Sequence, residues 1–288
     1  MEKLSVSIIG CGKVGKVVGY LLSKRVGCSI KGILNKSLLS SRNAVRFIKD
    51  GYACKDYKEL IISNLWLIST QDASISSVCQ ELLNHKKLLK GSIVIHFSGA
   101  LDSKVLYSAK KAGCFVGSLH PIRSFADPEL SIETFEGTYC AYEGDEQAFL
   151  LIRNLFEGIG AKIFRINKKA KSLYHIGSVF ASNYLIALLK ISYYFYYRAG
   201  VKENNIIDII YSLSSGTLES IKKNRSLEKS ITGPIQRGDI DVIKSHISSL
   251  KSMPFLLSLY KALGNIVSQS IYQSGKDRHF DYIKELLE

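Results

Sequence analysis

Short apolar runs alternate with helical periods through the first part of the chain. Between the runs, apolar residues recur at the spacing of an amphipathic helix, as in the helix predicted over residues 147–159. Alternating strands and helices are typical of a doubly wound, mostly parallel sheet. The apolar runs that predict its strands are residues 4–9, 29–34, 65–69, 92–96, 114–118, 138–142 and 162–165.

The pattern changes near residue 166, after which helical periods continue without a strand signal. They cover residues 169–198, 202–223, 239–249 and 254–274. The sequence therefore predicts an α/β domain with a doubly wound sheet over residues 1–165, followed by an all-α domain over residues 166–288.

A glycine-rich turn joins the first predicted strand to the first helix, in the order that a dinucleotide fingerprint requires. Gly10 permits the tight turn, Gly12 lets the backbone approach a pyrophosphate, and Gly15 lets the helix pack on the strand. The helix N-terminus then offers free N–H groups to phosphate. A tight turn in another α/β domain is the alternative. The predicted pyrophosphate site is Gly10, Cys11, Gly12, Lys13, Val14 and Gly15.

The second strand ends without the acidic residue that binds the ribose 2′-hydroxyl in NAD-specific folds. It runs instead into Asn35, which suits a hydrogen bond to the ribose, and into Lys36 and Ser37, which suit a 2′-phosphate and favour NADP over NAD. A polar loop with no ligand has a similar composition. Thr70 and Ser98 follow later strands at the edge where such sheets bind ligands, so both are candidate cofactor contacts.

Composition fits a globular protein, with 46% hydrophobic and 22% charged residues. The net charge of +14 is spread along the chain, and no nucleic-acid module is recognisable, so we expect no nucleic-acid partner. Six cysteines without metal-ligand spacing indicate free thiols, no metal site and a cytoplasmic location. The apolar residues 173–197 include His175, Asn183 and Lys190, which favours a buried helix over a membrane span.

A polar stripe on this helix is the first candidate for catalysis. At about 100° per residue, Lys171, His175 and Ser182 share a face, and Asn183 flanks it. Lys171 and His175 suit proton transfer to a substrate, and Ser182 and Asn183 suit substrate binding. A solvated lysine beside a hydrogen-bonded core histidine would give the same pattern.

Two further residues are candidates by position. His120 follows a strand and precedes a proline, where it either faces the nicotinamide as a catalytic residue or has a structural role in the turn. Arg237 lies in a loop between helices and suits an anionic substrate, although a plain turn explains this loop equally well.

Several blocks in order, from GCGKVG through HFSGAL, LHPIRSF and KSLYHIGSVFASNY to TGPIQRGD, resemble the Rossmann-like proteins with a C-terminal domain of unknown function 2520 (DUF2520). That family is similar to the β-hydroxyacid and 6-phosphogluconate dehydrogenases and to pyrroline-5-carboxylate reductase. In the β-hydroxyacid group a catalytic lysine is followed four residues later by an asparagine. Lys171 matches this lysine, but His175 replaces the asparagine.

The resemblance implies an NAD(P)-dependent oxidoreductase or dehydrogenase that acts on a small, anionic hydroxy acid, keto acid or imine. It also implies a homodimer formed through the helical domain, where the Tyr193–Tyr197 segment offers an apolar face. Two alternatives remain: a non-catalytic NADP-binding sensor, and an enzyme similar to prephenate dehydrogenase, whose HPM block the His120 motif resembles.

Overall fold

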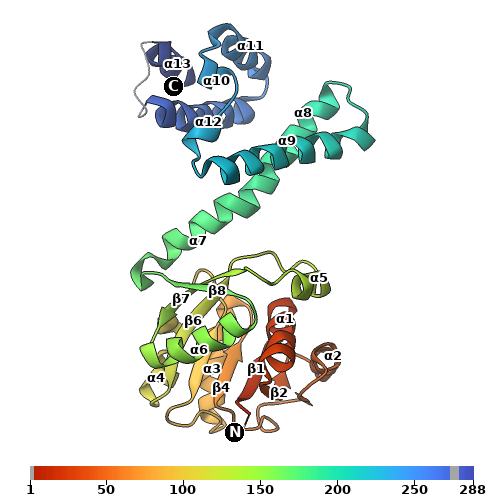
Figure 1. Ribbon diagram of the computed structural model, residues 1–288, viewed down its shortest axis with the longest axis vertical. Helices are drawn as coiled ribbons and strands as arrows, with labels where there is room; N and C mark the ends of the chain where they lie inside the picture. Colours follow the sequence, from red (N-terminus) through yellow and green to blue (C-terminus); the bar gives the residue numbers. More distant parts are fainter. Residues whose placement is uncertain (1–2, 273–278) are drawn as a thin grey trace. The chain divides into compact units, whose positions relative to one another are not determined.

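The computed structural model describes residues 3–272 and 279–288. The chain divides into two compact units, Met1–Leu185 and Ile186–Glu288 (Figure 1). The first unit contains the sheet and its flanking helices, and the second unit is helical.

An eight-stranded sheet forms the centre of the first unit, in the order β3-β2-β1-β4-β5-β6-β7-β8. Strands β1 to β6 are parallel, β7 runs antiparallel to β6, and β8 is parallel to β7. The predicted doubly wound fold is therefore confirmed. The strands are β1 Ser5–Ile9, β2 Ser29–Leu34, β3 Tyr52–Cys54, β4 Leu65–Ile68, β5 Ile93–His96, β6 Phe115–Pro121, β7 Tyr139–Gly144 and β8 Lys162–Arg165.

Helices cover both faces of this sheet, and the central strands supply a separate core on each face. In β1, Ile8 packs into one core and Ile9 into the other. Helix α5 was not predicted, although Asp127 caps it and Pro128 opens it. The helices are α1 Lys13–Leu21, α2 Leu38–Ile48, α3 Ile75–Asn84, α4 Tyr107–Lys111, α5 Pro128–Glu133, α6 Glu146–Gly158 and α7 Lys171–Val179.

The second unit contains longer helices around a small core of Ile243, Ile271, Ile283 and Leu287. The predicted helical periods form over the residues that the structure describes, while residues 273 and 274 of the last period lie outside them. The short helices α10 and α13 are additions to the prediction. The helices are α8 Leu185–Arg198, α9 Glu203–Asn224, α10 Pro234–Arg237, α11 Ile240–Leu250, α12 Pro254–Tyr272 and α13 His279–Leu287.

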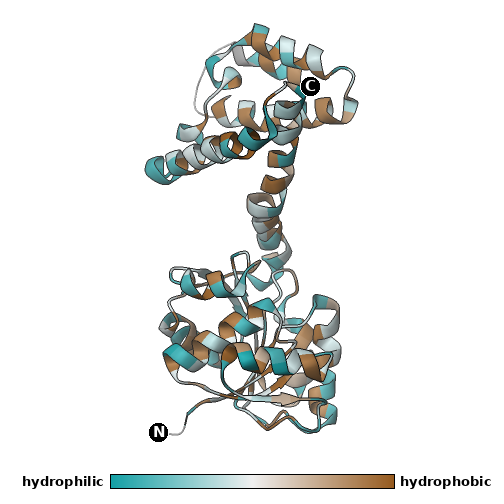
Figure 2. Ribbon diagram, turned by 90° about the vertical axis from the view of Figure 1, so that its right-hand side faces the viewer, coloured by the Kyte–Doolittle hydropathy of each residue, from teal (hydrophilic) through white to brown (hydrophobic). Residues whose placement is uncertain are grey.

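The expectation of a buried helix over residues 173–197 is wrong. Helix α7 continues through a π-helical turn, Phe180–Tyr184, into α8 (Figure 2), and many of its apolar side chains are exposed. Leu173 is 71% exposed, Phe180 62% and Ile186 59%. Residues 168–198 are also long and apolar enough to cross a membrane by length and composition. The residues that form the two cores of the first unit include none of residues 173–197.

Candidate functional site

The glycine turn stands at the carboxyl end of β1 and leads directly into α1. Gly10 has a φ of +75°, and its amide donates a hydrogen bond to the Leu34 carbonyl oxygen at 2.8 Å. A Cβ on Gly10 would lie 2.3 Å from Cγ2 of Thr70, so both the backbone conformation and the neighbouring strand require glycine. Gly12 is the N-cap of α1 and has no side chain to cap the helix. The first amides of α1 therefore have no side-chain partner from this residue.

A cavity of about 700 Å³ opens in front of this turn, across the carboxyl ends of β3, β2, β1 and β4. This size and position suit a dinucleotide. It is lined by Ile9, Gly10, Cys11, Gly12, Leu34, Asn35, Lys36, Ser40, Lys55, Asp56, Tyr57, Ser69, Thr70, Gln71, Ser74, Ser77 and Val78.

Six of the predicted cofactor residues line this cavity: Gly10, Cys11, Gly12, Asn35, Lys36 and Thr70. Cys11 is buried, and burial raises the pKa of its thiol to about 12, so it acts as a small filler and not as a nucleophile. The sequence pattern missed Lys55 and Tyr57, because they follow a three-residue strand whose partner only the sheet order reveals.

The other five predicted cofactor residues lie outside the lining of the cavity. The Lys13 amine donates to the Ala126 carbonyl oxygen at 2.7 Å, and Val14 and Gly15 pack inward. The Ser37 hydroxyl accepts from the Ser40 amide as the cap of α2, which removes it from the predicted phosphate site. The Ser98 hydroxyl donates to Asp72 at 2.8 Å.

A layer of polar side chains lies buried on the same sheet, beside this cavity. His96 of β5, Ser118 of β6 and Glu143 of β7 are direct partners across adjacent strands, so they share one face. All three are at most 4% exposed. Lys171, from the first turn of α7, reaches the same layer and is 2% exposed. The layer joins the end of the sheet to the start of α7.

The Lys171 amine makes an ion pair with Glu143 at 3.3 Å and donates to the Ser118 hydroxyl. Glu143 also accepts from the Ser103 amide and hydroxyl, at 2.7 and 2.8 Å. Burial lowers the pKa of Lys171, and the Glu143 carboxylate opposes this shift. The amine is thus fully engaged within the protein. Sequence reasoning missed Glu143. Its position beside Lys171 follows from the antiparallel pairing of β7 with β6, which places Glu143 opposite Ser118.

The rings of His120 and His175 lie next to each other and against Gly99, in the loop after β5. The ring centroids of His120 and His175 are 6.0 Å apart, and His120 Nδ1 shares a 2.7 Å hydrogen bond with the Tyr174 hydroxyl. A Cβ on Gly99 would lie 2.6 Å from His175 and 2.9 Å from His120, so glycine lets this loop approach both rings. The structure therefore brings together two predicted catalytic residues, and it adds Tyr174.

Burial lowers the pKa of His120 to about 4, with further contributions from His175 and Lys171. The pKa of the buried His96 falls to about 3 for the same reason, and its Nδ1 accepts from the Ser98 amide at 3.2 Å. Both rings are neutral at physiological pH. A neutral imidazole keeps one N–H donor and one acceptor, so each ring can donate one hydrogen bond and accept another.

The predicted substrate residues Ser182 and Asn183 do not continue the stripe of Lys171 and His175. Both are exposed, and both lie in the π-helical turn Phe180–Tyr184, which interrupts the α-helical spacing that the stripe assumes. Arg237 lies in the second unit, where its guanidinium pairs with Asp239 of the same loop at 2.7 Å. This contact gives Arg237 a partner within its own loop, and its role in substrate binding stays a prediction.

Residues 1–121 match the Rossmann-like domain family, and residues 138–266 match the domain of unknown function DUF2520. The chain is a Rossmann-like protein with a DUF2520 domain. The DUF2520 match begins at β7, so it includes Glu143 as well as Lys171 and the histidine of α7. No curated protein matches the chain significantly.

Solved structures share this two-part fold. Protein TM1727 from Thermotoga maritima is 26% identical, with a TM-score of 0.75 over 94% of this chain and 100% of its own. BF3122 from Bacteroides fragilis, described as a candidate NADP oxidoreductase, is 16% identical, with a TM-score of 0.72 over 92% and 98%. Plasmodium falciparum pyrroline carboxylate reductase with NADP bound is 12% identical, with a TM-score of 0.58 over 100% of both chains.

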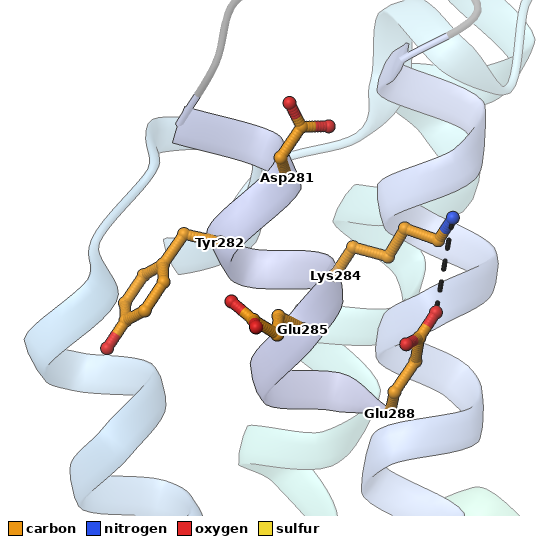
Figure 3. Close-up of a pocket in the computed structure, with 5 residues that line it drawn as sticks. All are labelled: Asp281, Tyr282, Lys284, Glu285 and Glu288. Atoms are coloured by element: carbon orange, nitrogen blue, oxygen red, sulfur yellow. Dashed lines mark ion pairs between the residues drawn. The ribbon is translucent and has the colours of Figure 1, made fainter.

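The second unit of this DUF2520 protein has a hollow of its own on α13 (Figure 3). It is lined by Asp281, Tyr282, Lys284, Glu285 and Glu288, and Lys284 lies 4.0 Å from the Glu288 carboxylate. These are solvated surface charges without a buried polar group among them. In the described part of the chain, no cluster of His, Cys, Asp or Glu is suited to a metal ion.

Proposed function

We propose that the protein is an NADP-dependent oxidoreductase that transfers a hydride between the nicotinamide and a small hydroxy acid, keto acid or imine. The observation that carries this proposal is the cavity at the glycine turn, with the two histidines standing two strands further along the same edge. If the pyrophosphate of a dinucleotide lies at Gly10 and the molecule extends past Thr70, its nicotinamide lies toward β5 and β6.

The comparisons support the proposal through the fold and through the names of the similar structures. One of them is described as a candidate NADP oxidoreductase, and another is a pyrroline carboxylate reductase with NADP bound. The cavity edge at Asn35 and Lys36 carries no free carboxylate for a ribose 2′-hydroxyl, which supports NADP over NAD.

NADPH, when bound, supplies a hydride to the substrate carbon, and the substrate oxygen or nitrogen then needs a proton. His120 and His175 are placed to supply it, because both rings border the loop at Gly99. The hydrogen bond to Tyr174 fixes the orientation of the His120 ring. Lys171, whose amine is bound to Glu143 and Ser118, suits a role in positioning α7, and its predicted proton transfer stays a prediction.

Titration with NADPH, followed by nicotinamide fluorescence, tests the cofactor site. We expect the wild type to bind NADPH, and Gly10→Ala to lose at least tenfold in affinity because a Cβ there collides with Thr70. Gly216→Ala is the control, since a Cβ at Gly216 on α9 meets nothing within 4 Å. Failure of the wild type to bind either NADPH or NADH would overturn the proposal.

Oxidation of NADPH with keto acids and cyclic imines tests the reaction itself. We expect turnover with a member of these classes, and a loss of about 10²–10⁴-fold in His120→Asn or His175→Asn, with NADPH binding retained. Binding without hydride transfer to any member of these classes would instead support a non-catalytic sensor.

We also propose a homodimer in the cytoplasm, formed through the exposed apolar face of α7 and α8. Leu173, Phe180 and Ile186 are each more than half exposed, which is unfavourable for a face left in water. The first turn of this helix is fixed to the sheet by the buried Lys171, and His175, Asn183 and Lys190 lie along it. These polar residues favour a protein partner over a lipid bilayer. All six cysteines are free and buried, as suits a reducing compartment.

A further inference from the structure

The cofactor cavity carries a second lysine that the glycine motif and the adjoining loop do not predict. Lys36 follows β2 and Lys55 follows β3, and these strands are parallel neighbours with Leu34 opposite Cys54. Parallel strands end at the same edge about 4.8 Å apart, so the two lysines leave the sheet side by side. Both line the cavity, together with Ser40 at the start of α2.

We propose that Lys55, with Lys36 and Ser40, forms a subsite for the 2′-phosphate of the adenosine ribose and determines the preference for NADPH over NADH. This inference rests on the proposed function. The subsite lies on the β2–β3 side of Gly10, whereas Thr70 and the histidines lie on the other side. The adenosine half of a dinucleotide therefore lies next to the two lysines when its pyrophosphate lies at the glycine turn.

The acidic groups near this subsite are already engaged. Asp56 is the carboxylate among the lining residues, and its Oδ1 accepts from the amides of Lys58 and Glu59 at 2.8 and 3.2 Å. It is thus held as a turn cap after β3, and not at the end of β2, where the acid of NAD-specific folds lies.

Glu59 is the present partner of Lys55. Its Oε1 lies 3.3 Å from the Lys55 amine, and its Oε2 accepts from the Lys55 amide at 2.8 Å. The pair is solvent-exposed, at 62% and 41% for the two side chains, so it holds the amine only weakly. A phosphate carries more charge and more acceptor oxygens than a carboxylate, and it would take over the amine without moving the backbone.

Isothermal titration of the full-length protein with NADPH, NADH, 2′,5′-ADP and 5′-AMP tests the subsite. We expect Lys55→Gln to weaken NADPH and 2′,5′-ADP about tenfold, which corresponds to about 1.4 kcal/mol, and to leave NADH and 5′-AMP within twofold. Lys58→Gln is the matched control, because it removes the same charge from an exposed neighbour that does not line the cavity. We expect it to change all four affinities less than twofold.

The outcomes separate the subsite from the proposed function. A wild type that binds NADH as tightly as NADPH, or a Lys55→Gln variant that leaves NADPH unchanged or weakens both cofactors equally, would overturn the subsite while the cofactor site stands. A wild type that binds none of the four ligands would overturn the proposed function itself. Glu59→Gln gives a further check, because freeing the Lys55 amine should strengthen NADPH and leave NADH unchanged.

Discussion

The two units of this protein differ in how far they bury their apolar side chains. The first unit buries them on both faces of a sheet and even buries an ion pair, Lys171 with Glu143. The second unit has a small core, and large apolar side chains such as Tyr211, at 74%, and Phe255, at 77%, are exposed. The apolar surface proposed for association begins on α7 of the first unit, with Leu173 and Phe180, and the second unit exposes more of it.

The difference also shows where chemistry is possible. Neutral histidines and a lysine with a lowered pKa occur in the first unit, where burial changes their titration. His246 of the second unit is exposed beside Tyr260. The catalytic proposal therefore belongs to the sheet and the first turns of α7, and the association proposal belongs to the rest of the helix.

The largest effect should come from Lys171→Met, which leaves the Glu143 carboxylate buried without its counter-charge. We expect the free energy of unfolding of the first unit to fall by about 3–5 kcal/mol. Trp66 is the sole tryptophan and is fully buried in the sheet, so its fluorescence in a urea titration reports on this unit. Lys190→Met on exposed α8 should cause no measurable change. Equal stability of the two variants would mean that the ion pair is not buried in solution.

A charge on the uncovered helix tests association. Ile186→Asp places a carboxylate on a side chain that is 59% exposed, and on both copies of a symmetric dimer. We expect the dissociation constant to rise at least 10²-fold, about 2.7 kcal/mol, by sedimentation at several concentrations. Ser245→Asp, on exposed α11, is the control. A wild type that stays monomeric at high concentration would contradict the dimer.

A methyl group at two glycines of the first unit should have opposite effects. Gly99→Ala forces the His120 and His175 rings apart, so we expect a loss of about 1–3 kcal/mol in the free energy of unfolding. Gly177→Ala, on α7, meets nothing within 4 Å and should gain about 0.5–1 kcal/mol from helix propensity. Trp66 fluorescence measures both changes, and a stabilised Gly99→Ala would show that the rings do not border this loop.

Acid should destabilise the first unit through its buried histidines. The pKa values of His96 and His120 fall to about 3 and about 4 in the folded state, below the ordinary value of 6.5. Between pH 6.5 and 4 the unfolded chain binds protons that the folded chain does not, so stability falls as the pH falls. Each histidine contributes up to about 1.4 kcal/mol per pH unit. Urea titrations at pH 7 and pH 5 test this, and a His120→Asn variant should show a smaller difference.

The strand pattern, the glycine turn and the helical second half were readable from the sequence, because each depends on local spacing. The backbone at Gly10 is left-handed and lies close to Thr70, and both features require the glycine that the motif supplies. The positions of Asn35, Lys36 and Thr70 at the cavity followed from the rule that parallel strands present their carboxyl ends at one edge.

Tertiary structure alone decided which of those residues have free side chains and which strands lie side by side. Ser37 caps helix α2, and a π-helical turn interrupts the α-helical spacing that was expected to align Ser182 and Asn183 with His175. Lys55 follows β3 and Glu143 lies in β7. The pairing of these strands with β2 and β6 places the two residues in their sites. Spacing along a chain fixes local periodicity, but strand order and register depend on contacts between distant residues, which no local pattern records.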